Sequence, residues 1–222
     1  MLNPKVSSFL EELRENNNRD WFQENKELYL EAKDYADKYF AQWHGRMQEF
    51  DEVDALKVFR IYRDVRFSKN KTPYKNHFSS SISRSQPYNR GGYYLEIGPE
   101  KSFIACGFWG PNKEDLFRIR KEIEIDSEEW NEIMDNKRIT KTWGSLQGSG
   151  VKVAPKGFDK THPDIVWIRK SQFVYHLEFD TENLEKENFL EEIVSSFRVT
   201  APFFKFMSSV LTTNLNGESL LN

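Results

Sequence analysis

The sequence contains one cysteine, Cys106, among 222 residues. A single thiol excludes a disulfide within the chain and any metal site built from paired cysteines. Because Cys106 lies in an apolar stretch, we expect a buried, unreactive thiol. No apolar run approaches the roughly 20 residues of a membrane-spanning helix, and the first residues lack the apolar stretch of a signal peptide. These absences predict a cytoplasmic protein.

Motifs that hold nucleotides, metals or hydrolytic nucleophiles are also missing. The chain has no Gly-x-x-x-x-Gly-Lys-Ser/Thr loop, no Gly-x-Gly-x-x-Gly turn and no Gly-x-Ser-x-Gly elbow. Its four histidines lie far apart, without the His-Glu-x-x-His spacing of a zinc helix. We therefore predict no metal site and no cofactor.

The charges that are present are unevenly distributed. Residues 57–75 carry seven Lys or Arg and one acid, Asp64, so this segment has a charge of +6 in a chain of net charge −3. The other residues together therefore carry −9. A basic segment in an otherwise acidic chain predicts an anionic partner.

Within this segment, residues 58–67 alternate with period two. The odd-numbered residues are apolar apart from Arg63, and the even-numbered ones are mostly polar. This pattern is typical of a strand with one buried face. We predict that Arg60 and Arg66 share the exposed face and that the polar residues after Phe67 form a loop.

The predicted strand and loop form a candidate site for an anionic ligand. Arginine and lysine bind phosphate or carboxylate groups through charge-assisted hydrogen bonds, and tyrosine adds a hydroxyl or a stacking face. The predicted ligand-binding residues are Arg60, Tyr62, Arg66, Ser68, Lys69, Lys71, Tyr74 and Lys75. The alternative is that these charges pair with acids elsewhere in the chain. Exposed pairs contribute only about 0–1 kcal/mol each, so stability gives little reason to gather them here.

Arg63 differs from the other basic residues because the alternation places it on the apolar face. An unpaired buried charge is costly, so we predict that Arg63 is mostly buried and paired with a carboxylate.

Further stretches accompany the run Arg60-x-Tyr62-Arg63-Asp64-x-Arg66-Phe67-Ser68-x-x-Lys71-Thr72-Pro73-Tyr74-Lys75. They are Asn17-Asn18-Arg19-Asp20-Trp21-Phe22, Gly92-Tyr93-Tyr94-Leu95, Pro155-Lys156-Gly157-Phe158 and His162-Pro163. Together they resemble an uncharacterised family, the domain of unknown function 2461. The resemblance covers nearly the whole chain. It implies no activity, so it supports the site without naming a reaction.

The rest of the chain favours an α+β fold. Alternation predicts further strands at 78–83, 93–97, 102–109 and 172–180. Helices are predicted at 3–16, 20–50, 111–125, 126–134, 161–170, 189–197 and 202–211, with a loop at 141–150. We expect an antiparallel sheet flanked by helices, with the N-terminal and C-terminal helices packing on it. We predict a single domain over residues 1–222 with a flexible C-terminal tail from about residue 213.

Three classes of function remain open. The first is a module that binds a phosphate-bearing small molecule or nucleic acid. The second is an enzyme acting on a phosphorylated or acidic small molecule, with Asp64 or His77 as general acid or base. The third is a scaffold that meets an acidic protein. A second basic cluster, at residues 152–170, would extend the site if folding brought the two together.

Overall fold

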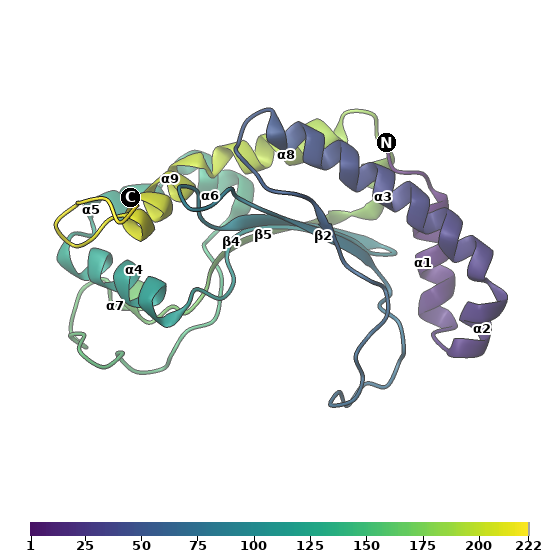
Figure 1. Ribbon diagram of the computed structural model, residues 1–222, viewed down its shortest axis with the longest axis horizontal. Helices are drawn as coiled ribbons and strands as arrows, with labels where there is room; N and C mark the ends of the chain where they lie inside the picture. Colours follow the sequence, from purple (N-terminus) through teal and green to yellow (C-terminus); the bar gives the residue numbers. More distant parts are fainter. Residues whose placement is uncertain (222) are drawn as a thin grey trace. The chain divides into compact units, whose positions relative to one another are not determined.

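In the computed structural model, which describes residues 1–221, helices flank a five-stranded antiparallel sheet (Figure 1). The strands are β1 (Lys57–Val58), β2 (Phe78–Ser83), β3 (Gly92–Ile97), β4 (Lys101–Phe108) and β5 (Phe173–Asp180), and they follow one another in the sheet in this order. The predicted α+β class is confirmed. A tight turn after Gly98 joins β3 to β4, and a Cβ at this glycine would lie 2.2 Å from the Lys101 carbonyl oxygen.

The helices agree with the prediction in most places. They are α1 (Lys5–Glu15), α2 (Arg19–Glu24), α3 (Lys26–Gln48), α4 (Lys113–Ile125), α5 (Glu128–Met134), α6 (Lys137–Trp143), α7 (Ile165–Ile168), α8 (Phe189–Val199) and α9 (Ala201–Thr212), with a 3₁₀ turn at Thr181–Glu185.

Three of the predicted boundaries are wrong. The helix predicted over residues 20–50 is broken at Asn25, whose backbone and side-chain N–H groups both donate to the Trp21 carbonyl and so end α2. Helix α6 enters the predicted 141–150 loop because the Asn136 side chain accepts from two backbone N–H groups and starts a helix there. Helix α7 is shorter than the predicted 161–170.

The chain divides into two compact units. Unit 1 comprises Met1–Ile82, Tyr94–Ile104 and Glu178–Ser195, and unit 2 comprises the rest of the described chain. The single domain over residues 1–222 stays a prediction, and so does the flexibility of its tail.

The core of unit 1 is built from aromatic rings between the N-terminal helices and the sheet. Phe9 of α1 and Tyr29 of α3 lie with their ring centroids 6.1 and 6.4 Å from that of Phe78 in β2. Phe9 and Phe78 are almost completely buried. These contacts attach α1 and α3 to β2, because stacked rings bury a large apolar area.

Unit 2 is built in the same way at the other end of the sequence. Tyr93 of β3 contacts Phe197 of α8 and Phe204 of α9, with ring centroids 5.0 and 5.1 Å apart. Cys106 of β4 is fully buried and its thiol donates to the Thr200 hydroxyl. Burial raises the pKa of this thiol, which keeps it protonated and unreactive.

Residues 59–77, which we call the arm, leave the sheet between β1 and β2 as an irregular antiparallel loop (Figure 1). Two backbone bonds hold its sides together, from Arg63 N to Pro73 O at 2.9 Å and from Lys75 N to Ile61 O at 2.8 Å. The strand predicted at 58–67 is therefore wrong beyond Val58. One reason is Pro73, which has no N–H group and cannot donate to the ladder.

The predicted alternation of faces nevertheless holds from Arg60 to Arg66, but it is wrong for Phe67, which it places on the inner face and which is 96% exposed at the end of the arm. Ile61 is 2% exposed, and Arg63 and Val65 are partly buried. The residues between and beyond them are exposed, namely Arg60, Tyr62, Asp64 and Arg66. Over residues 60–66 the pattern predicted which side chains face the protein, although the backbone is not a regular strand.

Candidate functional site

The arm is fastened to the turn between α1 and α2 by one side-chain amide. Asn17 Nδ2 donates to the Tyr74 carbonyl oxygen and Asn17 Oδ1 accepts from the Tyr74 N–H, both at 3.1 Å. The Tyr74 ring stacks on Phe22 of α2 with centroids 3.9 Å apart. Asn18 caps α2 by accepting from Trp21 N at 2.9 Å. Two stretches far apart in the sequence therefore form one local structure.

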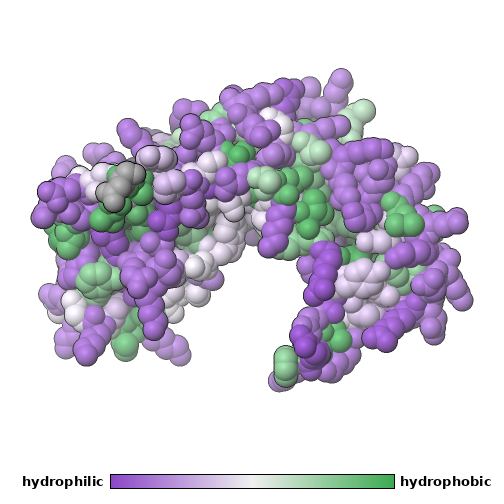
Figure 2. Space-filling model, viewed as in Figure 1, coloured by the Kyte–Doolittle hydropathy of each residue, from purple (hydrophilic) through white to green (hydrophobic). Residues whose placement is uncertain are grey.

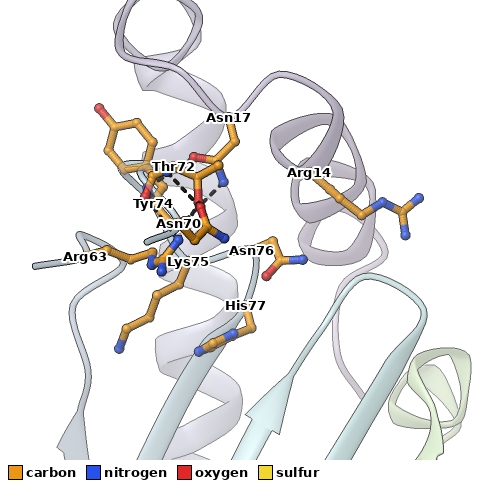
Figure 3. A pocket seen from close by; sticks show the side chains of 9 residues that line it. All are labelled: Arg14, Asn17, Arg63, Asn70, Thr72, Tyr74, Lys75, Asn76 and His77. Atoms are coloured by element: carbon orange, nitrogen blue, oxygen red, sulfur yellow. Dashed lines mark hydrogen bonds between the residues drawn. The ribbon is translucent and has the colours of Figure 1, made fainter. Parts of the chain in front are cut away.

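A pocket of about 370 Å³, the arm pocket, lies beside this contact (Figure 3). Its lining residues are Arg14, Asn17, Arg63, Asn70, Thr72, Tyr74, Lys75, Asn76 and His77. They include two arginines, one lysine and three amides but no carboxylate. Figure 3 shows that the Arg14 guanidinium points away from the other side chains. It is paired with Glu100 at 2.8 Å, so Arg63 and Lys75 supply the positive charge of the pocket.

Arg63 is not paired with a carboxylate, so that prediction is wrong. Its guanidinium donates to the Thr72 carbonyl oxygen and hydroxyl and to the Ser68 hydroxyl. Within residues 1–221 no acidic side chain lies at ion-pair distance from it. The side chain is only partly buried, because the arm leaves the sheet and its inner face meets the pocket rather than a closed core. Neutral acceptors orient the Arg63 guanidinium without cancelling its charge.

Lys75 brings a second charge to the pocket. Its Nζ lies 5.4 Å from the centroid of the Phe59 ring. Burial lowers the pKa of Lys75, the nearby Glu96 raises it, and the charge of Arg60 lowers it. A partly desolvated ammonium group next to another cation is stabilised by an incoming anion.

His77 lines the arm pocket and lies next to a carboxylate that is not part of the lining. His77 Nδ1 is 3.5 Å from Glu96 Oε1, and the Tyr94 hydroxyl donates to Glu96 Oε2 at 2.7 Å. Burial and the charge of Lys75 lower the pKa of His77 to about 4. Burial also raises the pKa of Glu96, against the opposing effects of Tyr94 and Lys75. His77 is therefore uncharged at neutral pH, and its contact with Glu96 is not an ion pair under those conditions.

The structure does not bring the predicted ligand-binding residues together in one site. Tyr74 and Lys75 line the arm pocket. Lys71 lines a second hollow of about 620 Å³, which shares Asn17 and Thr72 with the arm pocket, and its ammonium donates to the Val65 carbonyl at 3.0 Å.

The remaining predicted residues line neither hollow. Ser68 accepts from Arg63 at 3.4 Å, and the Tyr62 hydroxyl accepts from Lys26 at 3.1 Å. Arg60, Arg66 and Lys69 are exposed.

Of the two predicted catalytic candidates, only His77 reaches the arm pocket. Asp64 is exposed and pairs with Arg66 at 2.6 Å. The hydrogen bonds from Arg66 lower the pKa of Asp64. Its carboxylate is thus ionised and already occupied by a partner.

Sequence reasoning missed the amides of the site, Asn17, Asn70 and Asn76, together with Arg14 and Thr72. Asn17 opens one of the stretches that resemble the family, which was a signal that it contributes to the same structure as the arm. Arg14, in the helix predicted at 3–16, carried no such signal, whereas Asn76 was missed although it lies between the predicted residues Lys75 and His77.

A larger hollow in unit 1 has the opposite charge. This acidic groove of about 800 Å³ is lined by Ser7, Ser8, Glu11, Pro99, Glu100, Lys101, Asp180, Glu182, Glu185 and Lys186. Five carboxylates face two lysines, so the groove repels anions despite its size. Among the described residues no group of three or more His, Cys, Asp or Glu side chains is placed to hold a metal ion.

Across residues 1–221, none of the helices combines the length and the apolar character needed to span a bilayer.

Comparison with known proteins identifies a family but no characterised relative. None of the curated proteins matches the chain. A family model described as "Conserved hypothetical protein (DUF2461)" matches residues 5–206, which include α1, the arm, the whole sheet and part of α9. The chain therefore belongs to the DUF2461 family of conserved hypothetical proteins.

Proposed function

We propose that this protein binds a phosphate-bearing ligand in the arm pocket. The observation that carries the proposal is the lining: two cationic side chains, Arg63 and Lys75, stand among amides and hydroxyls with no carboxylate between them. A volume of about 370 Å³ lies in the range of small-molecule sites. Phosphate oxygens are matched by a guanidinium fork and an ammonium group, which together supply charge and directed donors.

The neighbours of Arg63 support this reading. Its guanidinium is oriented by Thr72 and Ser68, so a ligand meets a donor group whose position is already fixed. Preorganisation of this kind reduces the entropy lost when a ligand binds. A structural ion pair would instead have placed a carboxylate beside Arg63, and none is present among the described residues.

We expect Arg63→Ala to weaken the binding of pyrophosphate at least about tenfold, because a charge-assisted hydrogen bond contributes roughly 1.5–3 kcal/mol. Lys75→Met should weaken binding similarly while it keeps the apolar contact with Phe59. Calorimetric titration at low salt measures both effects, with inorganic phosphate as a second probe.

The matched control is Lys57→Ala. Lys57 Nζ lies 5.2 Å from the same Phe59 ring but outside the pocket lining, so its loss should leave the affinity unchanged. Arg63→Lys keeps a positive charge without the guanidinium fork and should bind with intermediate affinity. Failure of the parent protein to bind either probe would end the proposal.

A second candidate function, an enzyme acting on a phosphorylated or acidic small molecule, is favoured by the position of His77. An uncharged imidazole in the lining of a cationic pocket, 3.5 Å from a carboxylate, has the arrangement of a general base. Turnover of a phosphate ester that is lost in His77→Gln but kept in Asp64→Asn would support catalysis. Equal turnover by the parent and His77→Gln would exclude His77 as the base.

We also propose a cytoplasmic location. The support is the lone thiol of Cys106, which is buried and protonated and has no partner cysteine in the sequence.

A further inference from the structure

The tip of the arm, residues 64–71, presents one aromatic ring to solvent. Phe67 is 96% exposed, the highest value among the exposed large apolar side chains of the described residues. Figure 2 shows hydrophobic atoms at the free end of an otherwise mostly hydrophilic arm. A ring with so little burial contributes almost nothing to the stability of the fold, because apolar stabilisation follows the area removed from water. Its position therefore has no explanation in the packing of the protein.

One cation lies beside this ring and others belong to the same arm. The Arg66 guanidinium carbon lies 6.0 Å from the centroid of Phe67. Arg60 and Lys69 are exposed, and neither has an ion-pair partner among residues 1–221. Lys71 follows on the side of the arm that faces the second hollow. Asp64 is the only acid of the tip, so the positive charge prevails there.

A path leads from the tip to the arm pocket. The second hollow is lined by Lys71, Arg19 and one acid, Asp20, and it shares Asn17 and Thr72 with the arm pocket. The two hollows therefore adjoin each other at these shared residues. Among the described residues, cations without an ion-pair partner occur along this path, from Lys69 at the tip through Lys71 to Arg63 in the arm pocket.

We propose that the arm binds single-stranded nucleic acid, with a base stacked on Phe67 and backbone phosphates on the surrounding Arg and Lys side chains. This inference rests on the proposed function, because the phosphate group that binds in the arm pocket would be one of the backbone phosphates of the strand. Stacking on an exposed aromatic ring next to a basic track is how proteins hold single strands without reading their sequence. A duplex would not suit the site, because its base faces are covered by neighbouring base pairs.

The charge distribution favours a thin polyanion over an anionic bilayer. The basic segment of +6 belongs to a chain whose other residues sum to −9. A bilayer spreads its negative charge widely and would repel acidic surfaces within a Debye length of about 8 Å. A single strand can contact the arm alone. An acidic peptide could also do so, but its Asp and Glu side chains have no planar ring to stack on Phe67, whereas every nucleotide of a strand carries one.

Fluorescence anisotropy with a labelled oligonucleotide of about 12 nucleotides, in DNA and RNA forms, tests the stacking. Phe67→Ala should weaken binding at least about fivefold, and Phe67→Trp should restore it. Phe67→Leu keeps an apolar side chain without the aromatic face, so it should behave like the alanine variant. The control is Leu30→Ala, another exposed apolar residue, which should bind as the parent does.

The salt dependence tests the phosphate contacts. Each lost contact lowers the slope of log affinity against log salt by about 0.7 for a single strand, so Lys69→Ala/Lys71→Ala should lower it by about 1.4. Lys113→Ala/Lys137→Ala removes the same charge from exposed positions on α4 and α6 and should leave the slope unchanged.

Several results would overturn the inference. They are no oligonucleotide binding by the parent at low salt, equal binding by the parent and Phe67→Ala, or equal or tighter binding of phosphatidylserine vesicles or polyglutamate. Pyrophosphate binding that depends on Arg63, without any oligonucleotide binding, would sink the inference and leave the proposed function standing. Oligonucleotide binding that depends on Phe67, together with no binding of pyrophosphate or inorganic phosphate by the parent, would overturn the proposed function and leave the stacking on Phe67 standing.

Discussion

Replacing Asn17 by alanine is expected to lower the free energy of unfolding by about 2–4 kcal/mol. The change removes both hydrogen bonds between the Asn17 amide and the backbone of Tyr74, a residue that is 7% exposed. The N–H and carbonyl of Tyr74 would lose their partners in a largely desolvated position, at roughly 1–2 kcal/mol each. Urea unfolding of the parent and the variant measures the difference.

Two further substitutions test whether the loss of stability comes from the two hydrogen bonds of the Asn17 amide. Asn76→Ala removes an amide from the same pocket that has no hydrogen-bond partner among the described residues, and it should change stability by no more than about 0.5 kcal/mol. Asn17→Asp keeps the acceptor for the Tyr74 N–H but loses the donor to its carbonyl, so it should fall between the parent and Asn17→Ala. An alanine variant as stable as the parent would show that the amide does not fasten the arm.

The same Asn17 substitution connects stability to the site. Because the amide positions Tyr74, and Lys75 follows directly, loosening the arm displaces a cation of the arm pocket. We therefore expect Asn17→Ala to weaken pyrophosphate binding even where the protein remains folded, while Asn76→Ala has a smaller effect.

Acidification is expected to destabilise the parent protein through His77, by up to about 3 kcal/mol at pH 4. The pKa of His77 is about 4 in the folded protein, against 6.5 for an ordinary histidine. Between these two values the unfolded chain binds a proton that the folded protein does not. The contribution of His77 is therefore complete above pH 6.5 and is lost as the pH falls toward 4, at about 1.4 kcal/mol for each unit.

Glu96 acts in the opposite direction. Its pKa is raised by burial, so the folded protein takes up this proton before the unfolded chain does, and acidification stabilises the fold through this group. The comparison must therefore be made between the parent and His77→Gln, since both proteins keep Glu96. The difference in unfolding free energy between them should change by about 3 kcal/mol from pH 7 to pH 4.

Nuclear magnetic resonance provides a direct test of the same prediction. The imidazole signals of His77 should titrate with a midpoint near 4. A midpoint near the ordinary value of 6.5 would contradict the burial of the ring. Pyrophosphate should move the midpoint upward, because an anion near Lys75 offsets the positive field that helps to lower the pKa of His77.

Local patterns were enough to predict most elements and the faces of the arm. The period-two runs at 93–97 and 172–180 became β3 and β5, since alternating apolar residues are buried efficiently only on a sheet. Along residues 60–66 the same alternation predicted which side chains are exposed. The concentration of positive charge in residues 57–75, which is a property of the sequence alone, predicted that a binding site would involve the segment that forms the arm.

The composition of the arm pocket was decided by tertiary structure. Its position on the apolar face predicted that Arg63 is mostly buried and paired with a carboxylate. In the structure the arm leaves the sheet, and the Arg63 guanidinium is surrounded by hydroxyl and carbonyl oxygens. Asn17 lies 57 positions before Tyr74 and yet supplies its backbone partners. No periodicity reports such a contact, because periodicity describes only neighbours within one element. The sequence by itself determined where the charge and the exposed faces lie, and only the packing of the α1–α2 turn against the arm decided which of those charges share a pocket.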